Sequence, residues 1–136
     1  MDAQQALADL TEISSQIRAA VVFDDKGKVK GSTLPDGEAF AGAAAELLAA
    51  AEELRPGASP LTQLEIATGD GCVFVVRQGK ATIAATTGAD PTTGLVFYDL
   101  KSALHALDGQ PGRAEPTVVW QADAGTGAEE GGDGTA

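Results

Sequence analysis

The stretch CVFVVRQGKATIAAT, residues 72–86, carries the strongest strand signal in the chain. Residues 72–76 are apolar at every position, so both faces of this segment require burial, as they do in a strand inside a sheet. Gln78, Gly79 and Lys80 are typical of a tight turn, and residues 81–86 can return as a second strand. The stretch therefore predicts a hairpin whose first strand lies inside a sheet.

A third strand is predicted just before this hairpin. Residues 62–66 alternate between polar and apolar side chains, which suits an edge or half-buried strand, and Gly69-Asp70-Gly71 supplies the connecting turn. An uncovered edge strand offers unpaired backbone groups to a strand of another chain. We therefore expect Gln63 and Glu65 in an interface between two copies of the chain.

Residues 39–51 form a segment with almost no polar face, reading AFAGAAAELLAAA with Glu46 as its one charged residue. A helix that is apolar nearly all round requires burial on both sides. In a short chain, one side can pack on the sheet, while the other requires a second copy or another protein. The dimer interface expected on this helix comprises Phe40, Ala44, Ala45, Leu48 and Ala51. The alternative is that alanine occurs here simply as a good helix former in an alanine-rich chain.

The remaining elements are read from apolar spacing and turn residues. A stripe formed by Ala6, Leu10, Ile13 and Ile17 predicts an amphipathic helix up to residue 17. Strands at 20–23 and 28–34 follow, and Asp36 or a close neighbour is expected to cap the next helix. A last helix opens at residues 91–93 and ends near 108–109, with apolar positions three and four apart. The predicted class is α/β, of the α+β kind, in the order α-β-β-α-β-β-β-α over residues 1–108.

Residues 109–136 are rich in Gly, Pro, Ala and Thr, and they carry five acidic residues against Arg113 alone. Such a composition is typical of a flexible, mostly disordered tail. Within it, residues 116–120 read PTVVW and include the one tryptophan of the chain. Val118 and Trp120 are therefore candidate contacts to a partner or to the sheet, and the alternative is a solvated tail.

Length and charge argue against several functional classes. A chain of 136 residues with 43% hydrophobic residues suits one domain with one core. The net charge of −11, from 9 Lys and Arg against 20 Asp and Glu, argues against binding to nucleic acids or anionic membrane surfaces. No apolar run approaches the ~20 residues that cross a bilayer, and the first residues lack the features of a signal peptide. We therefore expect a cytoplasmic protein without membrane insertion.

Few side chains could carry catalysis. The one histidine, His105, lies in the last predicted helix, and no nucleophile is placed beside it by the sequence. Cys72 begins the most apolar strand and is expected to be a small core residue, with no second cysteine for a disulfide. Asp24, Asp25 and Asp36 do not have the spacing of a calcium loop. We therefore expect no catalytic residue, metal or cofactor, and a protein that is not an enzyme.

Over residues 3–108, the sequence resembles the Roadblock/dynein light-chain family and its bacterial MglB-like members. The likeness lies in a helix before the AVVF strand at 20–23, the turn at 24–27, the Ala- and Leu-rich second helix, and the GDG-to-CVFVV hairpin at 69–76. The resemblance implies a five-stranded antiparallel sheet, with the central helix on one face and the terminal helices on the other. It also implies dimers in which edge strands pair and central helices pack together.

The same resemblance implies a function. MglB-like members bind small Ras-like GTPases. The chain is therefore expected to be a non-catalytic homodimeric adaptor that binds and regulates such a GTPase. If it orders the switch loops of the GTPase, it would act as a GTPase-activating protein. An arginine supplied to the GTPase would have to be Arg18, Arg55, Arg77 or Arg113, and Arg55 is a candidate partner contact. The alternatives are a scaffold subunit without a GTPase partner and a profilin-like or PAS-like sensor of a small molecule.

Overall fold

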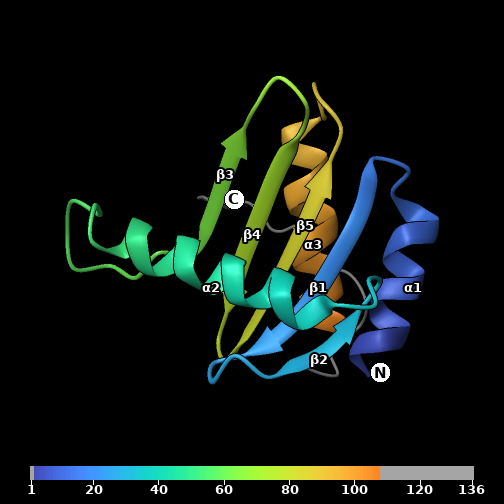
Figure 1. Cartoon of the computed structure of the whole chain (residues 1–136), viewed down its shortest axis with the longest axis horizontal. Helices are drawn as coiled ribbons and strands as arrows, with labels where there is room; N and C mark the ends of the chain where they lie inside the picture. The colour runs from blue at the N-terminus through green and yellow to red at the C-terminus, as the bar shows by residue number, and fades with distance from the viewer. Residues whose placement is uncertain (1, 108–136) are drawn as a thin grey trace, which may run out of the picture.

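A computed structural model of the chain describes residues 2–107 (Figure 1). It confirms the predicted class and the order α-β-β-α-β-β-β-α. All strand pairs are antiparallel, and the strands form one sheet in the order β2-β1-β5-β4-β3. The elements are α1 (Ala3–Ile13), β1 (Ile17–Asp24), β2 (Val29–Ser32), α2 (Gly37–Glu52), β3 (Gln63–Ala67), β4 (Cys72–Gln78), β5 (Ala81–Thr87) and α3 (Thr93–Leu107).

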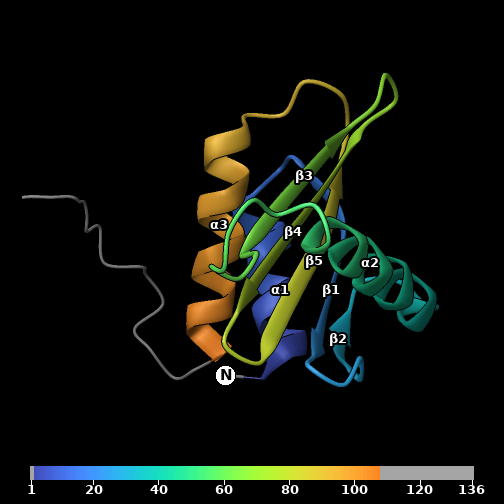
Figure 2. The same cartoon turned by 90° about the vertical axis from the view of Figure 1, so that its left-hand side faces the viewer.

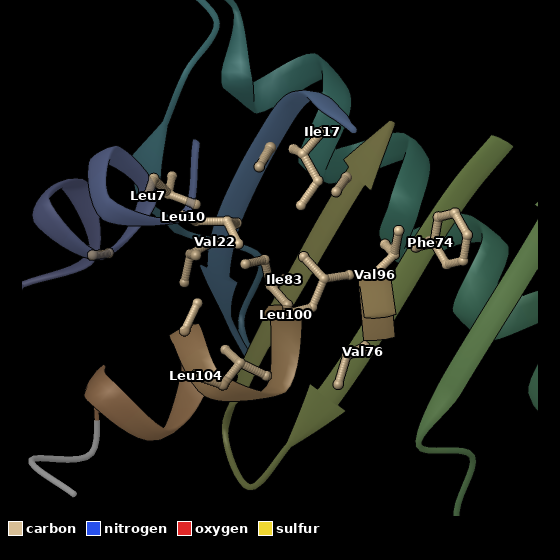
Figure 3. Packing of buried hydrophobic residues seen from close by; sticks show 14 of the residues in the cluster. Leu7, Leu10, Ile17, Val22, Phe74, Val76, Ile83, Val96, Leu100 and Leu104 are labelled. Atoms are coloured by element: carbon tan, nitrogen blue, oxygen red, sulfur yellow. The ribbon is translucent and has the colours of Figure 1, made fainter. Parts of the chain in front are cut away.

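The helices cover the two faces of the sheet unequally. Helix α2 crosses one face alone, and α1 and α3 pack side by side on the other, as Figure 2 shows. The larger core lies between the sheet and the pair α1 and α3 (Figure 3), and Phe74 meets Phe97 there edge to face, with ring centroids 5.0 Å apart. The smaller core lies beneath α2 and includes Val21, Phe23 and Val75. The arrangement expected from the resemblance is therefore present.

The first helix ends earlier than the apolar stripe predicts. Helix α1 stops at Ile13, which is 65% exposed, and Ser14 has an extended backbone with its N–H bonded to the Leu10 carbonyl. Ile17 belongs to β1, where it pairs with Thr87 and is buried in the larger core. The apolar residue at position 17 fits the spacing of the helix only by chance. Its conformation is that of a strand because it pairs with β5.

The predicted turns are confirmed by their backbone geometry. Gly27 and Gly79 have φ of 84° and 62°, which favours glycine in the β1–β2 and β4–β5 turns. The Asp24 carboxylate accepts hydrogen bonds from the backbone N–H groups of Lys26 and Lys28, both at 2.9 Å. Asp24 is therefore a turn residue. Asp36 precedes α2 at the capping position, but its side chain makes no capping hydrogen bond.

Candidate functional site

The outer edge of β3 is open to a partner strand. Its five residues pair with β4 in unbroken register. Thr62 accepts from the Arg77 N–H, and the Thr68 N–H donates to Gly71, so these even-numbered residues direct their backbone groups toward β4. Along a strand, the backbone N–H and C=O groups of successive residues point alternately toward one neighbouring strand and toward the other. Residues 63, 65 and 67 therefore direct their N–H and C=O groups away from β4. Within residues 2–107, no strand pairs with that outer side.

The outer side of α2 is exposed and consists mainly of alanines, with the charged side chain of Glu46 among them. Opposite the residues that face the sheet, the helix presents Ala39, Ala43 and Ala50, with Leu54 just beyond its end at 84% exposure. In Figure 1, the C-terminal part of α2 and the segment that follows it extend past β3. The C-terminal end of α2 and the open strand edge therefore lie on the same side of the molecule. A surface of this kind is typical of contacts with another protein.

The interface residues expected on α2 divide into two groups. Ala44 and Leu48 are 1% and 5% exposed, because they pack on the sheet in the smaller core. These two side chains therefore face the sheet and do not form part of the outer surface of the helix. Phe40 and Ala45 are half-buried against the same core, and Ala51 is half-buried. The outward alanines escaped prediction because a helix that is nearly all alanine gives no contrast between its sides.

The two residues expected on the strand, Gln63 and Glu65, are exposed on the β3 edge. The Glu65 carboxylate accepts a hydrogen bond from the Thr93 hydroxyl at 3.2 Å. Thr93 begins α3, so this contact joins the open edge to the first turn of a helix on the opposite face from α2. The Glu65 side chain is therefore tied to the face of the sheet that carries α3.

A cluster of charged side chains holds the segment between α2 and β3. The Glu52 carboxylate pairs with Arg77 and accepts from the Leu61 N–H at 3.3 Å, while Arg77 Nε donates to the Leu61 carbonyl at 3.1 Å. Arg55 binds Glu52 at 2.8 Å and donates to the carbonyls of Ala58 and Ser59 at 2.9 and 2.8 Å. The Arg55 guanidinium therefore fixes its own loop.

Arg77 also affects the titration of this cluster. Its hydrogen bond to Glu52 is the main cause that lowers the pKa of that carboxyl; partial burial opposes the shift, and the Leu61 N–H and the charges of Arg55 and Arg77 add to it. A carboxyl whose pKa is lower in the folded state stabilises the fold above its unfolded pKa, and this contribution disappears as the pH falls through the folded pKa. Glu52 therefore contributes at neutral pH and loses its contribution below about pH 4.5.

Glu52→Gln is expected to lower the unfolding midpoint at neutral pH and to have little effect at acid pH. The reason is that the wild-type carboxyl is itself protonated in acid and can no longer pair with Arg77. Urea unfolding across this pH range, with Glu53→Gln at the exposed neighbouring position as control, measures the difference. An equal loss at neutral and acid pH would contradict this role of the Glu52 charge.

The other candidate residues from the sequence lie mostly in the core or on helices, away from the β3 edge and the outer side of α2. Cys72 is buried in the larger core, and His105 lies half-exposed in the last turn of α3. Among residues 2–107 there is no group of His, Cys, Asp and Glu that could hold a metal ion. None of the described helices is both long and apolar enough to cross a membrane. Val118, Trp120 and Arg113 lie outside the described residues.

Hollows on the described surface include one of about 220 Å³ and one of about 370 Å³. The smaller lies between α2 and the two hairpin turns, with Phe23 and Leu48 in its lining together with the charged side chains of Arg77 and Lys80. The larger lies between the β3–β4 turn and the segment before α3. These are the places where a small molecule would bind if the chain were a sensor.

Comparisons with known proteins find no family model and no curated protein that match this sequence. Solved structures do match. A Roadblock/LC7 domain from Streptomyces avermitilis has a TM-score of 0.70 at 17% identity, covering 78% of this chain and 94% of that one. The gliding protein MglB from Thermus thermophilus has a TM-score of 0.65 at 19% identity, covering 76% and 83%. An MglB described in a tetrameric arrangement has a TM-score of 0.66 at 19% identity, covering 76% and 82%. With its helix order, its sheet and these likenesses, the chain has the Roadblock/LC7 fold.

Proposed function

We propose that this chain is a homodimeric adaptor that binds and regulates a small Ras-like GTPase. The observation that carries the proposal is the largely apolar outer side of α2 together with the open edge of β3 on the side where α2 ends. A second copy can cover both at once, because a two-fold axis brings identical surfaces together. The tetrameric arrangement of a structurally similar MglB supports self-association as a property of this fold.

The GTPase as partner rests on the resemblance to MglB-like proteins. In this proposal the domain of residues 1–108 acts in the cytoplasm without catalytic groups of its own, and it orders the switch loops of the GTPase by contact. The tail of residues 109–136 adds Val118 and Trp120 as further contacts. Such a regulator changes hydrolysis by binding one conformation of the GTPase better than the other.

Arg55→Ala is expected to leave any stimulated GTP hydrolysis unchanged. Its guanidinium is held by Glu52, Ala58 and Ser59, so it is not extended toward a partner. An arginine that stabilises the transition state is worth about 10³–10⁵ in kcat, so the two outcomes differ widely. Single-turnover hydrolysis by the GTPase with wild-type protein and with the variant gives the comparison. A collapse of the stimulated rate would assign Arg55 the catalytic contact.

The partner itself is tested by affinity capture from native extract, with GDP in one arm and a non-hydrolysable GTP analogue in the other. The proposal expects a small GTPase enriched in one arm, and the purified pair must then bind with the same nucleotide preference. Recovery of other proteins alone would favour a scaffold. A thermal shift with a metabolite and no GTPase would favour a sensor, because a ligand at 100 times its Kd adds ~2.7 kcal/mol to stability.

A further inference from the structure

The two edges of the sheet differ in how their outward backbone groups are bonded. On the β2 side, the Thr33 N–H donates to the Ala20 carbonyl at 3.0 Å, so Thr33 faces β1 and its neighbour Ser32 faces outward. The Gln4 side chain occupies this outward position. Its Nε2 donates to the Ser32 carbonyl at 3.0 Å, and its Oε1 accepts from the Ser32 N–H at 3.1 Å. The amide of Gln4 thus makes the two bonds that a neighbouring strand would make to Ser32.

Helix α1 holds Gln4 in place. The Asp2 carboxylate accepts from the Gln5 N–H at 2.9 Å and so caps the first turn, which contains Gln4. That turn lies directly on β2, because a Cβ at Gly31 would be 2.9 Å from the Ala3 carbonyl carbon and the Gln4 nitrogen. Only glycine at position 31 permits this approach without displacement of the helix. The position of the amide is therefore set by backbone contact.

The rest of the β2 edge is also unfavourable for pairing. The register between β1 and β2 shifts between Val22 and Phe23, which gives β2 an irregular ladder. Lys30 on β2 is exposed and places a charged side chain at this edge, 3.9 Å from the Asp24 carboxylate. Irregular pairing and edge lysines are devices by which proteins keep sheet edges from associating. Strand β3 has an unbroken register, and no side chain within residues 2–107 bonds its outward groups in this way.

We infer that the Gln4 amide is a built-in substitute for a sixth strand that closes the β2 edge against strand pairing. The surface it covers fits an extended backbone, in particular a strand of a second copy. With β2 closed, edge pairing is confined to β3, and a chain with one open edge forms a closed dimer instead of an extended row of sheets. The formation of a closed dimer through β3 rests on the proposed function, whereas the closure of the β2 edge by Gln4 does not.

Gln4→Ala tests the inference, because alanine keeps the helix and removes both hydrogen bonds to Ser32. Gln5→Ala is the matched control, since its side chain binds Asp9 within α1. Weight-average mass is measured by sedimentation equilibrium over a wide concentration range, with circular dichroism to confirm folding. We expect the mass of wild type and Gln5→Ala to level off at two chains. The mass of Gln4→Ala should continue to rise with concentration.

The same experiment in a Glu65→Pro background separates the two edges. Association of Gln4→Ala should persist there, since it runs through β2. A mass for Gln4→Ala equal to that of Gln5→Ala at every concentration would overturn the inference. If wild type is a single chain and Gln4→Ala still associates, the proposed β3 dimer fails while closure of β2 stands.

Discussion

Ala43→Glu should convert the dimer into folded single chains. Ala43 is exposed on the side of α2 opposite the residues that pack on the sheet, so the substitution leaves the core intact. In a two-fold interface built on this helix, each copy would add a second carboxylate, one turn from Glu46, to a contact that is otherwise apolar. A buried charge without a partner costs several kcal/mol, and a loss of about 4 kcal/mol raises Kd about a thousandfold.

The matched control for this variant is Ala8→Glu, which adds the same charge at an exposed alanine of α1. Sedimentation velocity gives the mass of both variants, and thermal unfolding confirms that both are folded. Ala8→Glu should stay dimeric. A folded Ala43→Glu protein with the Kd of wild type would place the interface somewhere other than α2.

Glu65→Pro should weaken the dimer through the strand edge. The Glu65 N–H points away from β4, so proline removes an outward donor in each copy and spares the β3–β4 ladder. Loss of two hydrogen bonds at about 0.5–1.5 kcal/mol each corresponds to a Kd roughly five- to 150-fold higher. The expected change is smaller than for Ala43→Glu, because the helix contact remains.

Glu65→Ala is the control for Glu65→Pro, since it keeps the N–H and removes the side chain that binds Thr93. Dilution measurements of Kd for the two variants separate the roles of backbone and side chain. Equal weakening by both would assign the effect to the carboxylate, and no weakening by either would rule out pairing through β3.

Much of the fold is predictable because its signals are local. The apolar run at 72–76 predicts a strand inside the sheet, and β4 lies between β5 and β3 as expected. The turns at Gly27 and Gly79 follow from residues that tolerate positive φ. The pairing of β1 with β5, unlike its hairpin with β2, does not follow from local patterns. This pairing joins residues more than 50 positions apart, for instance Val22 with Ile83, and depends on the whole core.

The candidate surface is less predictable for a related reason. The alternation at 62–66 indicates an edge strand, but Gln4 at the other edge has no signal in the sequence, because its role depends on the approach of Ala3 to Gly31. On α2, the apolar composition indicates contacts on two sides of the helix, but it does not show which residues face the sheet and which face outward. Ala44 and Leu48 consequently fall on the sheet side, and Ala43 on the outer side.

The unequal division of the core has a consequence for motion. Among the described residues, 15 buried side chains form the larger core and seven form the smaller one beneath α2. Elements held by fewer buried contacts open at a lower free energy, and amide hydrogen exchange measures this residue by residue. The amides of α2 should therefore exchange faster than those of β1 and β5 in dilute protein and slow down as a second copy covers the helix. The rigidity of α2 would then depend on the protein's own concentration, while that of the sheet would not.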